Sequence, residues 1–177
     1  MIQTLISSKT RIKLLLKFFL DGETRSYLRH LETEFGESTN AIRLELNKFE
    51  KAGMLISEHE GNRKYFKAND QHPLFQDVKS IVRKYIGIDW IVEYVAKRLG
   101  ELKQVYLTGS IANGIDSQII ELIFIGEINE EFLHELCQKV EKQIQRKIQY
   151  KVLINTQSFD KLFEESDAKF ILLWEKT

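Results

Sequence analysis

The stretch that decides the fold of the amino-terminal half reads STNAIRLELNKFEKAGML, residues 38–55. Its apolar side chains recur at helical spacing and form one face suited to burial, made by Ile42, Leu46 and Phe49. Ser38 precedes this run, where its hydroxyl can accept hydrogen bonds from the free N–H groups at a helix start. Gly53 closes the run, and strand-like residues follow. The stretch therefore predicts an amphipathic helix that leads directly into a β-strand.

Two helices are predicted before this stretch and a hairpin after it. Ser8 can cap the first helix, whose apolar positions are Ile12, Leu15, Leu16 and Phe19. The second helix is predicted from about residue 25 to residue 34, with Tyr27, Leu28 and Leu31 facing inward. Downstream, a Gly61-Asn62 turn separates two short β-prone runs, a pattern typical of a hairpin.

The order helix, helix, turn, helix, hairpin is that of a winged helix-turn-helix, whose last helix enters the major groove of DNA. Lys, Arg, Ser and Thr hold phosphates, whereas Arg on guanine and Asn on adenine read base edges. We expect Thr39, Asn40, Arg43 and Asn47 to read bases and Lys48, Arg63 and Lys64 to hold phosphates. The full candidate interface consists of Ser38, Thr39, Asn40, Arg43, Asn47, Lys48, Asn62, Arg63 and Lys64.

Residues 38–55 resemble the recognition helix and the exit segment of ArsR/MarR-like winged-helix repressors, and residues 58–67 resemble their basic wing. The resemblance covers roughly residues 8–86 and implies double-stranded DNA as the partner. The chain departs from the family pattern at Leu44, where a polar or basic residue is common. Three glutamates also dilute the expected basic face: Glu37, Glu45 and Glu50.

The second half alternates strands and helices. Strands are predicted at 105–108, 119–125, 151–154 and 170–174, with helices over 90–99 and 131–144 and a short helix around residues 159–163. The expected fold class is α+β: an N-terminal winged helix-turn-helix domain, residues 1–87, followed by a small nucleotidyltransferase-like α/β domain, residues 88–177.

The nucleotidyltransferase resemblance lies in residues 107–126, LTGSIANGIDSQIIELIFIG, where a Gly-Ser turn ends a strand. In that family the turn cradles phosphates, and two carboxylates on alternate residues of the next strand hold Mg²⁺. This chain keeps the Gly109-Ser110 turn but has Ile119 two residues before Glu121. Asp116 is five residues from Glu121, so a regular strand would direct the two to opposite faces. We therefore expect no catalysis, no metal site and no cofactor, but a vestigial nucleotide-binding set of Gly109, Ser110 and Glu121.

Charge and composition set further limits. The 26 basic and 26 acidic side chains cancel overall, but residues 1–88 carry 15 basic and 11 acidic side chains, an excess suited to a polyanion. The single cysteine, Cys137, excludes an internal disulfide. No apolar run reaches the ~18 residues of a membrane span, and residues 1–8 lack the pattern of a signal peptide. A cytoplasmic protein without membrane contact is expected.

Together these patterns predict a sequence-specific DNA-binding transcriptional regulator whose inactive second domain senses a phosphate-bearing ligand or supports a homodimer. A two-fold dimer would present two recognition helices about 34 Å apart, matching half-sites one turn apart. Two alternatives stay open from the sequence. One is an active nucleotidyltransferase that uses Glu121 and Asp116. The other is an antitoxin-like module that binds another protein.

Overall fold

The computed structural model describes residues 6–164 and 166–176. Residues 1–5, 165 and 177, which fall within the two expected domains, lie outside the described residues. The chain divides into two compact units, Met1–Tyr85 and Ile86–Thr177. Helices and two separate β-sheets make the fold class α+β, as expected. Among the described residues, no helix is long and apolar enough to cross a membrane.

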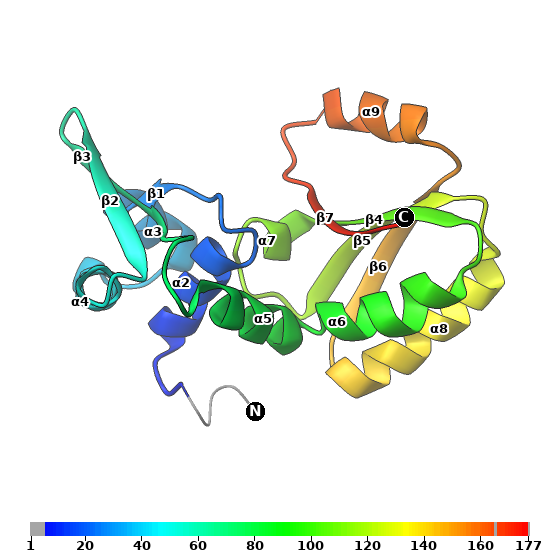
Figure 1. Cartoon of the computed structure of the whole chain (residues 1–177), viewed down its shortest axis with the longest axis horizontal. Coiled ribbons are helices and arrows are strands. Elements are labelled where there is room, and N and C mark those ends of the chain that lie inside the picture. The colour runs from blue at the N-terminus through cyan, green and yellow to red at the C-terminus, as the bar shows by residue number, and fades with distance from the viewer. Residues whose placement is uncertain (1–5, 165, 177) are drawn as a thin grey trace. The chain divides into compact units, whose positions relative to one another are not determined.

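In its described residues, the first unit is a winged helix-turn-helix built from four helices and a three-stranded sheet (Figure 1). In chain order its elements are α2 (Lys9–Phe19), β1 (Ser26–Tyr27), α3 (Leu28–Phe35), α4 (Thr39–Lys51), β2 (Leu55–Glu60), β3 (Arg63–Ala68) and α5 (Phe75–Ile86).

The core of this unit forms where α2, α4 and α5 meet around Phe19. The Phe19 ring centroid lies 6.4 Å from that of Phe49 and 5.9 Å from that of Phe75. Ile42 and Leu46, on the face of α4 expected to be buried, are almost completely shielded from solvent. Each buried side chain of this size stabilises the fold by about 1.5–3 kcal/mol. The core therefore fixes which face of α4 remains outside.

The hairpin and the short β1 form an antiparallel sheet in the order β1-β3-β2. Glu60 pairs with Arg63 across the predicted Gly61-Asn62 turn. One prediction was wrong here: the second helix begins at Leu28, not near residue 25, because Ser26 and Tyr27 pair with Phe66 and Tyr65 of β3. Tyr27 is therefore a half-buried strand residue and not part of a helix face.

The second unit contains a four-stranded sheet with helices on both faces (Figure 1). Its elements are α6 (Ile88–Trp90), η1 (Ile91–Val95), η2 (Ala96–Arg98), β4 (Leu102–Thr108), α7 (Gly109–Ala112), β5 (Ile119–Gly126), α8 (Glu130–Ile144), β6 (Lys147–Leu153), α9 (Thr156–Glu164) and β7 (Ile171–Glu175). The predicted helix over 90–99 is in fact three consecutive turns of α, π and 3₁₀ type, and Trp90 is exposed.

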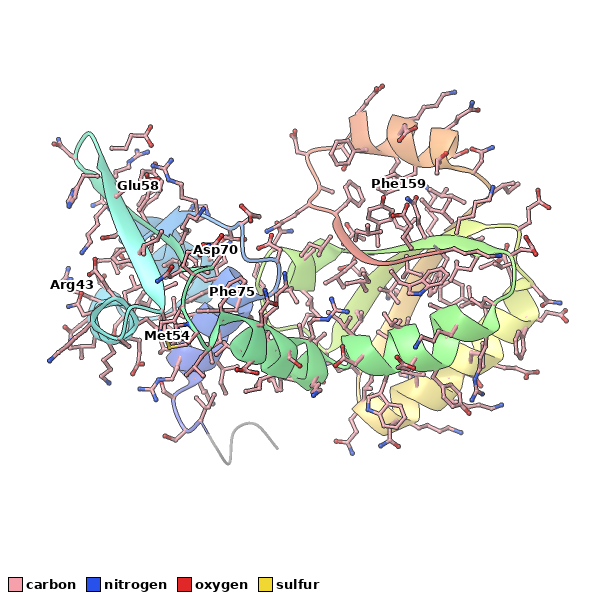
Figure 2. The ribbon with its side chains drawn as sticks, viewed as in Figure 1. Arg43, Met54, Glu58, Asp70, Phe75 and Phe159 are labelled. Atoms are coloured by element: carbon pink, nitrogen blue, oxygen red, sulfur yellow. The ribbon has the colours of Figure 1, made fainter. Side chains whose placement is uncertain are left out.

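The sheet has the strand order β6-β5-β4-β7, with β5 and β6 parallel and the other neighbours antiparallel. The helix α8 lies against one face, and α9 covers part of the other. There the Phe159 ring stacks on Tyr106 at 4.2 Å between centroids (Figure 2). As expected for a central strand, β5 is buried along most of its length.

Candidate nucleic-acid interface

The helix α4 is positioned by a cap at its start and by its apolar face. The Ser38 hydroxyl accepts a hydrogen bond from the backbone N–H of Ala41 at 3.2 Å, so this side chain is used as the N-cap. Because Ile42 and Leu46 hold the inner face, the outer face presents polar side chains to solvent. Figure 2 shows Arg43 on the outer side of α4. The exposed residues of this face that were expected to contact DNA are Asn40, Arg43, Asn47 and Lys48.

The glutamate in the middle of α4 points inward and not toward the outer face. Glu45 is 7% exposed and accepts hydrogen bonds from Arg11 Nε at 2.8 Å and Lys48 Nζ at 3.0 Å. Burial disfavours its charge, but the bonds from Arg11 and Lys48 outweigh burial, so the pKa of Glu45 is lowered. Glu45 therefore links α4 to α2 and adds little negative charge to the surface that faces solvent.

The other two glutamates near the interface are paired in the same way. Glu37 pairs with Lys13 at 2.7 Å. Burial alone would raise the pKa of Glu37, but the pairing outweighs burial, so this pKa is lowered. Glu50 accepts bonds from Lys64 at 2.7 Å and from Ser57, which lower its pKa. Each of these glutamates therefore neutralises a neighbouring cation and so lowers the net positive charge of this region.

A groove of about 870 Å³ lies between α3, α4 and the hairpin. It brings together six of the nine candidate residues from two separate segments of the chain: Thr39, Arg43, Asn47, Asn62, Arg63 and Lys64. The other three, Ser38, Asn40 and Lys48, do not line it. Glu32 is the one carboxylate among the described residues that line it, against three arginines and a lysine. The groove is therefore basic, as a polyanion site requires.

Tyr27 and Arg29 are among the groove residues that the sequence interpretation did not assign to the interface. Tyr27 was assigned to a helix face because it precedes Leu28 and Leu31 at a plausible spacing. Its pairing with Tyr65 depends on the distant strand β3 and leaves no local signal. Arg29 is the second residue of α3, and its charge in a helix-turn-helix segment was the signal that could have identified it.

A row of arginine and tyrosine side chains, in the order Arg63, Tyr27, Tyr65, Arg25, links the hairpin to β1 and the residue before it. The Arg63 guanidinium lies over the Tyr27 ring at 4.9 Å, and the Arg25 guanidinium lies over the Tyr65 ring at 3.9 Å. The two rings meet edge to face at 5.2 Å. Arg25 is also held by Glu58 at 2.6 Å, so it is neutralised, whereas Arg63 at the groove is not ion-paired with any described carboxylate. This row holds Arg63 in place over the groove.

Two of the three cations expected to hold phosphates are already paired with carboxylates. Lys48 and Lys64, both expected to hold phosphates, are bound to Glu45 and Glu50. Arg43 forms no salt bridge with the described residues. Since a cation already paired with a carboxylate gives less net attraction to a phosphate, Arg43 and Arg63 are the stronger candidates.

In the second unit the Gly-Ser turn lies against Glu121. The Ser110 N–H donates to Glu121 Oε1 at 3.3 Å. Gly109 adopts a φ of +69°, and a Cβ on it would lie 1.9 Å from the same oxygen, so the turn requires glycine. The three residues of the expected vestigial set are thus together. The Ser110 N–H, which would donate to a phosphate, already donates to the Glu121 carboxylate.

The remaining acids of this region do not converge. Asp116 pairs with the buried Arg146 at 2.9 Å, and Gln149 of β6 lies opposite Glu121 of β5. Within residues 6–164 and 166–176, no group of three or more His, Cys, Asp or Glu side chains could hold a metal ion. The residues present therefore do not fit the two Mg²⁺ ions that a nucleotidyltransferase requires.

Cys137 lies in the core-facing side of α8. Burial, with a smaller effect of Glu141, raises the pKa of its thiol to about 12. A thiol this weakly acidic stays protonated at neutral pH and is a poor nucleophile, consistent with a core residue.

Comparison with known proteins gives partial likenesses in structure. No protein-family model and no curated protein sequence matches the chain. AF1382 from Archaeoglobus fulgidus is similar over 48% of this chain and 96% of its own, with 22% identity and a TM-score of 0.39. Reduced HlyU from Vibrio cholerae is similar over 47% of this chain and 79% of its own, with 12% identity and a TM-score of 0.36. Likenesses at this level carry no argument about function.

Proposed function

We propose that this protein is a sequence-specific DNA-binding transcriptional regulator of the ArsR/MarR-like winged-helix type. The observation that carries the proposal is the basic groove between α4 and the hairpin. Its three arginines, Arg29, Arg43 and Arg63, form no salt bridge with any described carboxylate, while Asn47 and Asn62 offer amides beside them. Phosphate binding needs free cations, and base reading needs amide and guanidinium groups on an exposed helix face.

The roles follow from the placement of each side chain. Arg43 and Asn47 lie one turn apart on the outer side of α4, with Thr39 and Asn40 at its start, so all four would face base edges. Arg63 from the hairpin and Arg29 from α3 flank the helix and would hold the backbone on either side. Lys48 and Lys64 would add a weaker contribution because of their paired glutamates.

A second copy of the chain would supply the other half of a palindromic site. The helix α5 and the residue before it carry an apolar stripe at the spacing i, i+4, i+7, i+11, of which Leu74 and Ile81 are exposed and Val78 and Tyr85 are partly buried. Leu74, just before the helix, is 53% exposed, and Ile81 is 48% exposed. This is the spacing with which two helices pack along a seam.

The charges beside the stripe select an antiparallel pairing. When Val78 faces Ile81 of a second copy, Asp77 lies beside the second copy's Lys84, and the reverse contact forms by symmetry. A parallel pair would leave both charges without an opposite partner. Because a pair of 12-residue helices buries less than the ~1,200 Å² of a stable interface, we expect a dimer that is strengthened by two half-sites on DNA.

For the second unit we propose a nucleotidyltransferase-like domain without catalysis. Support comes from the mixed sheet with a Gly-Ser turn at the end of β4, and from Ile119 and Gln149 at positions where the chemistry needs acids. A phosphate-bearing ligand would have to displace the Glu121 carboxylate from the Ser110 N–H. That cost favours a structural or dimer-supporting role over ligand sensing.

Selection from random-sequence DNA at physiological salt tests the regulator proposal with the full chain. We expect a short palindrome with half-site centres about 34 Å apart. Arg43→Ala should relax the sequence at one position and cost about 1–3 kcal/mol there. Lys97→Ala makes the same charge change in the second unit, where Lys97 pairs with Glu93, and should leave selection unchanged. Recovery of no consensus, or equal effects of both variants, would refute the proposal.

Charge reversal tests the pairing of α5. Asp77→Lys and Lys84→Asp should each shift the dimer toward monomer in sedimentation equilibrium, and the double variant should restore it. A double variant as monomeric as the single ones would exclude the antiparallel arrangement. Circular dichroism of each variant controls for loss of the helix itself.

A further inference from the structure

One apolar side chain stands at the centre of the outer face of α4. Leu44 is 51% exposed and lies two residues from both Ile42 and Leu46, about 160° around the helix from each. Its neighbours one turn away on the same face are polar: Asn40 before it and Lys48 after it. Leu44 therefore faces away from the core and contributes nothing to its packing.

Leu44 is isolated from other exposed apolar groups on this helix. A docking surface for a protein partner would need a contiguous apolar patch, whereas the residues at three- and four-residue spacing are asparagine, alanine and lysine. It instead lies among the groups proposed to read bases, next to Arg43 and one turn from Asn40 and Asn47. An apolar contact at this place requires an apolar group on the base edge.

The major groove offers one such group, the C5-methyl of thymine. Cytosine presents an amino donor and no methyl at this edge, and adenine and guanine present only polar atoms there. We propose that Leu44 contacts the C5-methyl of a thymine in each half-site, and so makes that position specific for thymine. This inference rests on the proposed function, because it assumes that α4 enters the groove.

Uracil provides the test, because it lacks only this methyl group and keeps the base pairing of thymine. Each thymine of a duplex selected from random-sequence DNA is replaced in turn by deoxyuridine, and affinity is measured by fluorescence anisotropy at fixed salt. We expect one position in each half-site where the replacement weakens binding about fourfold, the effect of losing one buried methyl-sized group. At that position Leu44→Ala should bind thymine and uracil duplexes equally.

Ile56→Ala is the matched control. Ile56 is 45% exposed but lies on β2 and not on the helix proposed to enter the major groove, so its variant should keep the full preference for thymine. Leu44 is exposed and alanine favours helices, so the fold should persist, which melting curves check. The inference alone would be overturned if replacing thymine by uracil left the affinity for the selected duplex unchanged. It would also be overturned if Leu44→Ala kept the preference for thymine over uracil. A protein that selects no DNA sequence would overturn the regulator proposal together with it.

Discussion

Arg63→Ala should flatten the salt dependence of DNA binding, because Arg63 is a free cation in the groove. Its guanidinium is held over the Tyr27 ring at 4.9 Å and carries no carboxylate partner among the described residues. Its charge is therefore available to displace a counterion from a phosphate. The neighbouring Lys64 differs, since it is bound to Glu50 at 2.7 Å.

The magnitude follows from counterion release. Each phosphate contact changes the slope of log affinity against log salt by about 0.9. Between 50 and 200 mM salt, one contact is therefore worth about 3.5-fold, and the two arginine contacts assigned to phosphates, Arg63 and Arg29, about 12-fold per protomer. Without Arg63 the loss over the same range should fall to about 3.5-fold per protomer, and the slope for a dimer should flatten by about 1.8.

Fluorescence anisotropy titrations of the selected duplex at several salt concentrations measure this slope. Arg63→Lys keeps the charge and should keep the slope, although it loses the planar stack on Tyr27. Lys97→Ala changes the net charge equally but outside the groove, and should also keep the slope. An unchanged slope in Arg63→Ala, or an equal flattening in Lys97→Ala, would refute the assignment of Arg63 to a phosphate.

Four further predictions concern stability and chemistry. Because the folded pKa of Glu45 is lowered, its contribution is full above the ordinary glutamate pKa of ~4.3 and is lost as the pH falls through the folded value. Glu45→Gln should therefore cost about 1–3 kcal/mol at pH 7 and progressively less as the pH falls below ~4.3, as thermal melts across this range would show. Gly126→Ala places a Cβ 2.4 Å from the carbonyl oxygen of Glu101 and should cost about 2–5 kcal/mol by urea unfolding. Gly36→Ala has a positive φ but open space, so a loss of only about 1–2 kcal/mol is expected. Finally, labelled ATP with Mg²⁺ should leave no label on the wild type, and a label that disappears in Glu121→Gln would establish a transferase.

The paired glutamates show how a chain without net charge can present a positive groove. Basic residues of α2 neutralise acids of the neighbouring segments, as Arg11 does for Glu45 and Lys13 for Glu37. The interior of the first unit thereby takes up negative charge that would otherwise oppose DNA. The arginines of the groove are left to act on the outside.

Much of the fold could be predicted from sequence because it is encoded locally. Helical periodicity located α4, and a serine before it identified its cap. A Gly61-Asn62 turn located the hairpin, since such turns connect two strands directly. The missing alternate carboxylates were equally visible, because residues on alternate positions of one strand share a face whatever the surrounding fold.

Tertiary structure alone decided which cations are free. The partner of Glu45 is Arg11, 34 residues away, and that of Lys64 is Glu50, 14 residues away across two elements. Tyr27 entered the groove only because a distant strand pairs with it. The periodicity of a sequence shows which residues share a face of one helix, one turn apart, or of one strand, two residues apart. Ion pairs and sheet contacts between elements depend instead on how those elements pack together.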